Sequence, residues 1–471
     1  MADKKKTKAE ELAEKLLSDK KNGILRADDK EIAAADDFNE GYKSFLNTAK
    51  TEREAVCEIV RLAEAKGFKA FERGKKYKAG DKFYFVNRNK AVILTVMGKQ
   101  DISKGIRLAA AHIDSPRLDM KQNPLYEDKE IAYFKTHYYG GIKKYQWPTV
   151  PLSLHGVIIK GDGSKVTVRI GEDEGDPVFC ISDILPHLAD SQYKRPAPQL
   201  IRGEELNIIV GSRPFKDDKI SNKVKLNIMA ILNEKYGIVE DDLISAELEA
   251  VPAFKAVDVG FDRSMVGSYG QDDRVCAYTS LMAILDIKKP DMTCMTVLTD
   301  KEETGSDGNT GLNSSYLPYF INDLAAVYGA QGYNVMSNSE CLSADVNAAV
   351  DPTFAEPFEI RNASQINYGV VATKFTGARG KSGTSDASAE FVGRVRNLFD
   401  KHNIIWQTGE LGKVDAGGGG TVAQYIANLD FDVIDVGVPV LSMHAPFEIT
   451  SKLDNYMAYR SFVVFFEDPA K

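Results

Sequence analysis

Two adjacent glutamates, Glu302 and Glu303, stand between an apolar stretch and a glycine-rich turn in the segment LTDKEETGSDGNTGL, residues 298–312. Adjacent carboxylates disfavour each other's ionisation. Residues 293–299, just before them, are rich in β-branched and apolar types, which predicts a buried strand. Ligands in open α/β sheets lie at the carboxyl ends of such strands. The pair is therefore expected at the edge of a core, where two negative charges are costly unless a cation binds beside them.

Two of the six histidines also close apolar runs. His112 ends IRLAAAHID, and His444 ends VGVPVLSMH. Asp114 follows His112 after one residue, a spacing that suits a metal-ligating imidazole whose second ring nitrogen is held by a carboxylate. A single histidine at a strand end is more often an ordinary hydrogen-bonded residue. The other four lack acidic neighbours in such settings and are expected to be structural or surface residues: His137, His155, His187 and His402.

Further aspartates occur where they could join these histidines. Asp272 and Asp273 open a predicted helix in YGQDDR, where aspartate is also an ordinary capping residue, and Asp345 lies among small residues in SADV. Together the histidines and carboxylates form the ligand inventory of a two-metal hydrolytic site, which suits zinc and similar divalent ions. One glutamate of the pair can then bind metal while its neighbour takes the proton from a water that attacks a carbonyl group.

An α/β arrangement is expected to position these residues. Strands are predicted at 83–87, 91–98, 106–114 and 293–299, and helices at 8–18, 38–48, 51–66, 223–236, 272–287 and near 313–322. The rhythm is interrupted after residue 120, and LHGVIIKGDGSKVTVRIG at 154–171 predicts a β-hairpin. We therefore predict a catalytic α/β domain from residues 1–120 and 263–471, with a β-rich domain inserted at 121–262.

The composition limits the possible functions. The chain has 471 residues, of which 43% are hydrophobic and 27% charged, as in ordinary globular proteins. A net charge of −8 argues against nucleic acid as the main partner. No apolar run approaches the roughly 20 residues of a membrane helix, and the amino end predicts an amphipathic helix rather than a signal peptide. The five cysteines are scattered without a C-x-x-C motif, which indicates a reduced cytoplasmic location.

Five stretches, in order along the chain, resemble the aspartyl aminopeptidase/aminopeptidase I family of metallo-aminopeptidases: GIRLAAAHIDSPRLDMKQNPLYED, GSYGQDDRVCAY, DKEETGS, SADV and MHAPFEITSKLD. The resemblance implies a mixed-sheet catalytic domain like that of zinc peptidases, with an inserted dimerisation domain. It also implies removal of N-terminal residues from peptides, and self-association of dimers into a tetrahedral homododecamer.

The resemblance assigns roles to the chemically interesting residues. Glu302 matches the general base, and Asp114 the carboxylate that orients a metal-bound histidine. Two divalent ions per subunit are implied, most commonly zinc, with cobalt or manganese as alternatives. The implied ligands are a bridging Asp272, His112 and Asp345 on one ion, and Glu303 and His444 on the other. Resemblance to the wider metallopeptidase clan also implies a cis peptide between Asp272 and Asp273.

The chain departs from the family pattern at positions outside the ligand set. Ala348 and Asp351 stand where eukaryotic members usually have histidines, and HYYGGIKKYQW places Tyr145 where a histidine usually reaches a neighbouring subunit. These changes leave open whether acidic or neutral N-terminal residues are preferred. Arg379 and Lys381 are candidates for contact with an acidic side chain, or ordinary solvated charges. The glycine run at 415–423 lacks the ending of a phosphate loop and is expected to form a substrate wall or a tight turn.

The aromatic and glycine-rich segment 137–150, including Tyr145 and Trp147, predicts a projecting loop that crosses a subunit boundary and helps to close a neighbour's site.

Two other functions compete with that of an aminopeptidase. A related deacylase or carboxypeptidase would keep the same metals but cleave a different amide. A catalytically silent assembly or peptide-binding protein would be favoured by loss of Glu302 or a ligand, and none is lost.

Overall fold

The computed structural model describes residues 6–18, 20–217 and 219–469. The predicted catalytic domain also includes residues 1–5, 19 and 470–471, and the predicted inserted domain includes residue 218; these positions lie outside the described residues. Its largest sheet has nine strands in the order β1-β2-β3-β13-β4-β14-β18-β16-β17. The central β13, β4, β14 and β18 are parallel, whereas β3 and β16 join them antiparallel. The predicted mixed α/β class is confirmed. The strands are β1 (Lys69–Ala70), β2 (Lys82–Asn87), β3 (Ala91–Val96), β4 (Ile106–His112), β13 (Thr293–Thr299), β14 (Glu340–Ser343), β16 (Val370–Thr373), β17 (Trp406–Thr408) and β18 (Asp432–Gly437).

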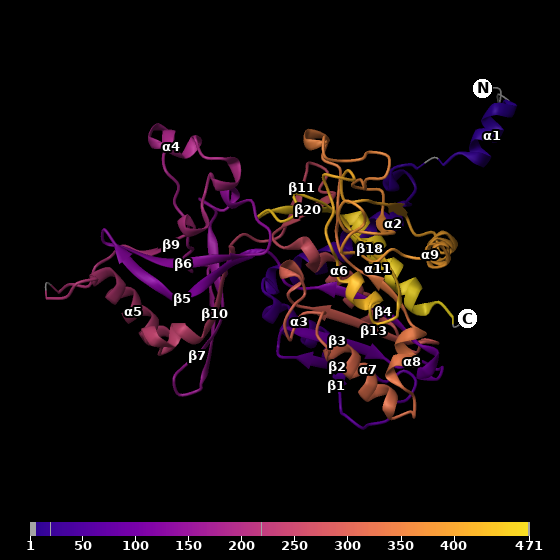
Figure 1. The fold of residues 1–471 in the computed structure, drawn as a ribbon, viewed down its shortest axis with the longest axis horizontal. Coiled ribbons are helices and arrows are strands. Elements are labelled where there is room, and N and C mark those ends of the chain that lie inside the picture. Colours follow the sequence, from indigo (N-terminus) through magenta and orange to yellow (C-terminus); the bar gives the residue numbers. More distant parts are fainter. Residues whose placement is uncertain (1–5, 19, 218, 470–471) are drawn as a thin grey trace.

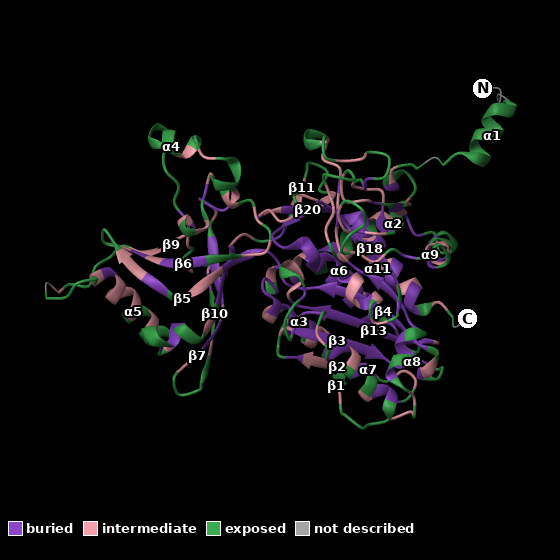
Figure 2. Cartoon of the chain, viewed as in Figure 1, coloured by how far each residue is buried: buried purple, intermediate pink, exposed green. Residues whose placement is uncertain are grey.

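Helices cover both faces of this sheet. Side chains alternate between the faces of a strand, so Ala109 and Ala111 of β4 belong to one core with α2, α3, α6, α9 and α11, whereas Leu108 and Ala110 belong to another with α7, α8 and α10. Burial on both faces explains why the central strands are continuous apolar runs (Figure 2). The helices are α2 (Asp29–Thr48), α3 (Glu52–Ala65), α6 (Gln271–Asp286), α7 (Tyr316–Ala326), α8 (Gly332–Ser337), α9 (Ala389–Lys401), α10 (Ala423–Ala427) and α11 (Lys452–Glu467).

A second sheet of six antiparallel strands, in the order β8-β7-β10-β5-β6-β9, forms the part at the left of Figure 1. Its core includes Trp147 and the inward side chains of β7, and α5 (Lys223–Tyr236) packs beside it. The predicted hairpin at 154–171 is β7 and β8. The strands are β5 (Arg117–Asp128), β6 (Ile131–Tyr139), β7 (Leu152–Ile159), β8 (Lys165–Ile170), β9 (Ile208–Gly211) and β10 (Ala246–Pro252), and α4 (Asp190–Tyr193) lies between β8 and β9.

A third sheet joins segments that are distant in sequence. Its order is β11-β12-β20-β19-β15, and β12 pairs antiparallel with β20. This pairing brings the β19–β20 turn, which contains His444, beside the start of α6, which contains Asp272. The strands are β11 (Val257–Val259), β12 (Met265–Ser268), β15 (Asn347–Ala348), β19 (Pro439–Leu441) and β20 (Glu448–Ser451).

Most predicted elements occur, and the boundaries of two helices need comment. The helix predicted at 38–48 is the second half of α2, which begins at Asp29 because the Asp28 side chain caps it by accepting from Glu31 N–H. The helix predicted near 313–322 is α7, which begins at Tyr316. The amino-terminal α1 (Lys8–Leu16) has no buried residue and extends away from the sheets (Figure 1). No helix in the described residues is both long and apolar enough to cross a membrane.

Candidate metal centre

The carboxyl ends of the central parallel strands bring the predicted residues to one edge of the sheet. β4 ends at His112, whose register partner on β13 is Thr299, and Glu302 and Glu303 follow in a short 3-10 turn. Asp345 comes just after β14 on the other side of β4. The third sheet adds Asp272 and His444 from the side. The structure therefore brings together every residue that the sequence singled out as a ligand or base.

Asp272 lies between the two histidines. Its Oδ1 is 3.1 Å from Nε2 of His112, and its Oδ2 is 3.2 Å from Nε2 of His444. Glu303 Oε1 is 3.6 Å from His444 Nε2, and Asp345 Oδ1 is 3.9 Å from His112 Nε2. One carboxylate thus faces two imidazoles, each of which has a second carboxylate nearby.

Asp114 connects His112 to the glutamate pair. Its Oδ1 is 3.3 Å from His112 Nδ1 and accepts from the Glu302 N–H at 3.1 Å, while its Oδ2 accepts from the Glu303 N–H at 3.2 Å. The Glu302 carboxylate lies 3.8 Å from His112 Nε2. Asp114 is therefore placed to orient both the imidazole and the main chain of the pair.

The peptide bond between Asp272 and Asp273 is cis, which confirms the cis peptide that the sequence analysis predicted.

The protein surroundings disfavour negative charge on several of these carboxyl groups. Burial, followed by the repulsion of Asp114 and Asp272, raises the pKa of Glu302 to about 7 against the opposing charge of His112. Burial and the charge of Asp272 hold the pKa of Glu303 well above its usual range, although the histidines oppose them. For Asp272 the hydrogen bonds from His112 and His444 outweigh burial, so its pKa is lowered. A cation at this place would relieve the repulsion and favour the charged forms.

The donor set fits a divalent cation. Two groups have ligand atoms within 4.8 Å of one another: His112 with Asp273 and Asp345, and His112 with Asp272 and Glu303. Among the described residues, the buried Glu303 Oε1 has no hydrogen-bond partner. A buried carboxylate oxygen without a donor is costly, and a metal ion would satisfy it. Imidazole and carboxylate ligands are those that zinc prefers.

A comparison with known families agrees with this geometry. The chain matches the model of the aminopeptidase I zinc metalloprotease family, M18, over residues 45–466. The chain belongs to this family. The predicted resemblance is confirmed, and so is the predicted class of enzyme, a metal-dependent aminopeptidase.

Bacterial members of M18 are similar to the chain over nearly their whole length. A probable M18 family aminopeptidase 1 from Clostridium acetobutylicum is 50% identical over 96% of this chain and 98% of its own. The crystal structure of an M18 aminopeptidase from Thermotoga maritima superposes with a TM-score of 0.92 at 44% identity, covering 96% of this chain and 99% of that one. The S. cerevisiae mApe1 dodecamer shares the fold, with a TM-score of 0.74 at 20% identity over 93% and 97% of the chains.

Glu448 was not predicted as a functional residue, and Asp273 was noted only as the second aspartate at the start of a helix. Glu448 Oε1 accepts from the His444 N–H at 2.7 Å, and its Oε2 accepts from the Asp272 N–H at 3.0 Å. Asp273 Oδ2 accepts from the His112 N–H at 3.4 Å, and its other oxygen has no hydrogen-bond partner among the described residues. Glu448 stands four residues after His444, and Asp273 directly follows Asp272, so their only sequence signal was proximity to predicted ligands.

The segment 137–150 contains one buried and one exposed aromatic residue of those predicted to project at a subunit boundary. His137 to Tyr139 end β6, and Trp147 is 0% exposed in the core of the six-stranded sheet. The prediction was therefore wrong for Trp147, because neighbouring apolar residues of its own chain cover the indole. Tyr145 is 51% exposed, as a surface position requires. The Gly141 carbonyl accepts from His444 Nδ1 at 2.7 Å, so the segment contacts the centre of its own chain.

A cavity of about 630 Å³ opens at the cluster. Much of its remaining lining is main chain from two glycine-containing loops, 376–383 and 418–421. The loops are held together by a hydrogen bond from Gly377 N–H to the Gly419 carbonyl at 2.6 Å. At Gly418, φ is +119°, and an added Cβ would lie 2.0 Å from the Gly377 oxygen, so only glycine fits there. Arg379 and Lys381 do not line the cavity; Lys381 pairs with Asp386 at 2.7 Å.

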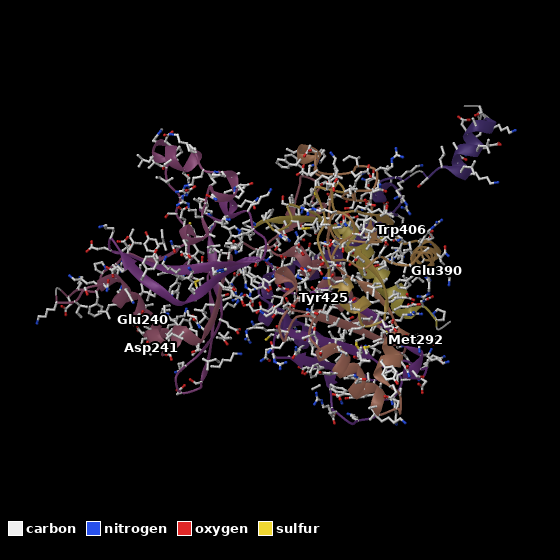
Figure 3. The ribbon with its side chains drawn as sticks, viewed as in Figure 1. Glu240, Asp241, Met292, Glu390, Trp406 and Tyr425 are labelled. Atoms are coloured by element: carbon white, nitrogen blue, oxygen red, sulfur yellow. The ribbon has the colours of Figure 1, made fainter. Side chains whose placement is uncertain are left out.

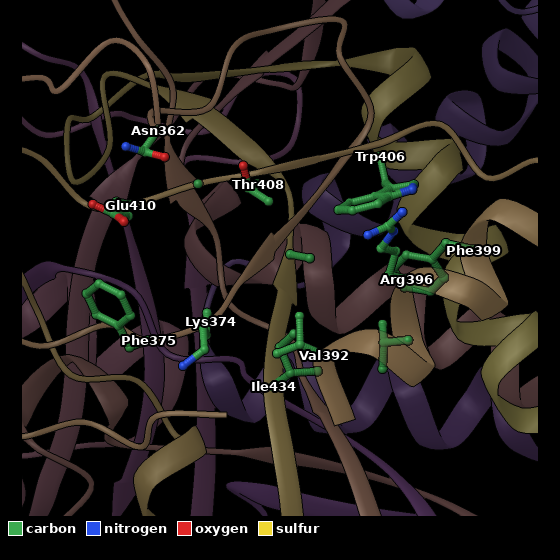
Figure 4. Close-up of a pocket in the computed structure, with 13 residues that line it drawn as sticks. Asn362, Lys374, Phe375, Val392, Arg396, Phe399, Trp406, Thr408, Glu410 and Ile434 are labelled. Carbon is green, nitrogen blue, oxygen red and sulfur yellow. The ribbon is translucent and has the colours of Figure 1, made fainter. Parts of the chain in front are cut away.

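A separate cavity of about 350 Å³ lies beside β16 and α9 (Figure 4). Trp406 and Arg396 are at one end, and Phe375 and Glu410 at the other. No described His or Asp lines it, and its Lys374 pairs with Asp386. Figure 3 places Tyr425, which lines the larger cavity, far from Glu240 and Asp241 of the six-stranded part.

The four remaining histidines lie away from the cluster. His155 is buried between Glu54 at 2.7 Å and Glu172 at 3.2 Å. The other three are exposed: His137, His187 and His402.

Proposed function

We propose that the chain is a two-metal aminopeptidase that removes single residues from the amino ends of peptides. The absence of cationic side chains from the described lining of the cavity carries this proposal. Its described lining contains acidic residues and one histidine but neither Lys nor Arg: Asp272, Glu302, Glu303, Asp345 and His444. The α-ammonium group of a peptide meets no cationic side chain in this lining that would repel it. The α-carboxylate of a carboxypeptidase or deacylase substrate would find no cationic side chain in this lining.

Two divalent ions account for the arrangement of the ligands. Zinc is the first choice because the family is one of zinc metalloproteases, with cobalt or manganese as alternatives. We assign Asp272 as the bridge, because its two oxygens face the two histidines. His112 and Asp345 complete one ion, and Glu303 and His444 the other. When bound, the ions supply positive charge that acidifies a water molecule and polarises the scissile carbonyl.

Glu302 is the proposed general base. In the proposed reaction its carboxylate accepts a proton from the attacking water and then gives a proton to the leaving amine nitrogen. Its main chain is held by the hydrogen bond to Asp114, so the carboxylate keeps its place as the proton moves. Asp114 also lies against Nδ1 of His112, which leaves Nε2 free to bind metal. The two neighbouring glutamates would thus divide ligation and proton transfer.

The lining favours a neutral N-terminal residue. Apart from the cluster, the side chains around the cavity are apolar or uncharged: Val346, Asn347, Thr376, Ala378, Ser382, Leu411, Thr421, Gln424, Tyr425 and Met443. An acidic side chain would be desolvated there without a cationic partner. Arg379 and Lys381 lie outside the lining. We therefore propose a preference for residues such as leucine or methionine over aspartate or glutamate.

Matched substrates test the proposal. Metal-free protein reloaded with zinc, cobalt or manganese should hydrolyse leucyl-anilide and leave N-acetyl-leucyl-anilide intact, and a chelator should abolish the activity. Hydrolysis of the acetylated substrate alone would favour a deacylase-like enzyme. Metal uptake without hydrolysis of either substrate, or of aspartyl- and methionyl-anilides, would favour a silent binding protein.

We also propose that subunits assemble through residues 121–262 as dimers and then as a tetrahedral dodecamer. Near α5, this part exposes apolar side chains that include Ile220, Ile231 and Val239, and large exposed apolar side chains are typical of interfaces. A relative in fold is described as a dodecamer. Because Tyr145 is exposed, we still propose that segment 137–150 reaches a neighbouring subunit. Light scattering should give a mass far above the 51.9 kDa of one chain; a monomer with full activity would contradict this.

The proposed location is the cytoplasm, with peptides as substrates and neither nucleic acid nor membrane as a partner. All five cysteines are free thiols, as is usual in a reducing compartment. The net charge of −8 disfavours binding to nucleic acid.

A further inference from the structure

The segment Tyr139–Gly141 joins the six-stranded sheet to the metal centre. β6 ends at Tyr139, whose hydroxyl donates to Asp114 Oδ2 at 2.7 Å. Two residues later, the Gly141 carbonyl accepts from His444 Nδ1 at 2.7 Å. The segment therefore contacts residues at both ends of the proposed metal pair.

Asp114 depends on Tyr139 for one of its donors. The Asp114 carboxylate accepts from Tyr139 and from the main-chain N–H groups of Glu302 and Glu303. The tyrosine hydroxyl and the Glu303 N–H share Oδ2, so together they fix the rotation of the carboxylate. Because Asp114 holds the glutamate pair, a change in this rotation is transmitted to the proposed base.

Tyr139 is itself held in place by its own sheet. Its cross-strand partner is Arg117, whose guanidinium lies 3.9 Å from the centre of the tyrosine ring. Arg117 is buried and pairs with Asp119 at 2.8 Å and with Glu249 at 3.3 Å. An arginine that stacks on the tyrosine ring and forms ion pairs restricts the movement of the ring. The hydroxyl therefore stays within hydrogen-bond distance of Asp114.

The next residue allows a close approach of the main chain. Gly140 has a φ of +73°, and an added Cβ would lie 3.2 Å from Oε2 of Glu303. A side chain here would therefore crowd a proposed ligand. Glycine lets the chain turn from β6 across the glutamate pair and reach His444.

We propose that Tyr139 is a positioning residue for hydrolysis, acting through Asp114 on Glu302 and Glu303. The six-stranded part of the molecule thereby helps to build the catalytic centre of its own chain. This inference rests on the proposed function, since it concerns the same centre. It makes the tyrosine hydroxyl, rather than the ring, the group that matters.

Tyr139→Phe removes only this hydroxyl. Partners of this kind usually change activity or metal affinity about 10- to 100-fold, so kcat should fall at least about tenfold while KM stays within about twofold. Zinc affinity, measured by competition with a chelator, should weaken. Tyr133→Phe is the matched control, because Tyr133 is on the same strand but its ring stacks on Tyr126 rather than lying near Asp114; it should behave as wild type. Thermal unfolding of both variants checks the fold.

A double-mutant cycle tests the route through Asp114. In an Asp114→Asn background, Tyr139→Phe should have little further effect on zinc affinity or kcat. Equal effects of Tyr139→Phe in both backgrounds would overturn the proposal, as would a Tyr139→Phe enzyme with wild-type kcat and zinc affinity. Zinc affinity needs no substrate, so the cycle remains decisive even if leucyl-anilide is not hydrolysed and the proposed function fails.

Discussion

The cavity has two kinds of lining that differ in chemistry and in construction. One is a cluster of carboxylates and imidazoles fixed at the ends of the central strands and beside the third sheet. The other consists of glycine-rich main chain and uncharged side chains from loops. The charged lining is held by hydrogen bonds through Asp114 and Glu448, whereas the loops are held by close main-chain contacts such as that of Gly418 with Gly377.

This difference suggests a division of labour. Groups that must hold metals and move protons need fixed geometry, which strands and their hydrogen-bonded partners provide. Loops on a rigid scaffold can vary the shape of a site without disturbing that geometry. Changes in the charged lining should therefore alter turnover or metal content, and changes in the loop lining should alter the choice of substrate.

The largest effect is expected from the base. Glu302→Gln keeps the size of the side chain but cannot accept the proton, so turnover should fall at least about a hundredfold with metal content and assembly unchanged. Steady-state kinetics and metal analysis of the same sample measure both. Glu410→Gln, which changes a glutamate outside this cavity, is the control. Near-normal turnover of metal-replete Glu302→Gln would remove the base assignment.

The ligands should divide into two groups. His444→Ala and Glu303→Ala should each weaken one ion, and His112→Ala and Asp345→Ala the other. Metal analysis should find bound metal falling from about two ions per chain towards one. His402→Ala, at an exposed position, should keep the full amount. Any ligand variant that retains both ions loses its place in the assignment.

The loop lining is expected to determine which N-terminal residue is preferred, rather than the rate of hydrolysis. Leu411→Arg introduces a cationic side chain into a lining whose described residues include neither Lys nor Arg. It should raise the ratio of aspartyl- to leucyl-anilide hydrolysis about fivefold, as expected for roughly 1 kcal/mol from a partly exposed ion pair. Arg379→Ala, which removes a charge outside the lining, should leave this ratio unchanged. If instead Arg379→Ala lowers acidic activity and Leu411→Arg has no effect, the division of labour is wrong.

The smallest effect concerns stability where α3 meets the six-stranded sheet, at Glu54 of α3 and His155 of β7. Burial lowers the pKa of His155, but hydrogen bonds to Glu172 and Glu54 outweigh it and raise the pKa. A raised histidine pKa stabilises the fold fully below the unfolded value of about 6.5 and is lost as the pH rises through the folded value. In urea unfolding, the stability difference between wild type and His155→Gln should therefore shrink from pH 6 to pH 9. A difference that is constant with pH would contradict this.

The sequence predicted the charged lining because each element that carries it has a recognisable local sequence pattern. His112 ends one apolar run, and Glu302 and Glu303 follow another; both runs predict buried strands. The carboxyl ends of parallel strands lie at one edge of a sheet. Glu448 contacts Asp272, and Tyr139 contacts Asp114, through sheet pairings that no local pattern specifies. Trp147 was misplaced for the same reason, since residues from other strands of its sheet bury it.

The loop lining was only partly predictable. The glycine run at 415–423 was expected to form a substrate wall or a tight turn, and Gly418 to Gly420 line the cavity. Whether Arg379 and Lys381 reach the cavity depends on how their loop folds, and Lys381 turns instead to Asp386 and the Phe375 ring. Side-chain direction in an irregular loop has no periodicity from which it could be read.

The most direct test of the central claim is anomalous diffraction from a zinc-loaded crystal at the zinc edge. The account predicts two peaks per chain, roughly 3.5–4 Å apart, with Asp272 between them. His112 and Asp345 should lie at one peak, and Glu303 and His444 at the other. A single peak, or a pair in which Asp273 rather than Asp272 is the bridge, would contradict the account.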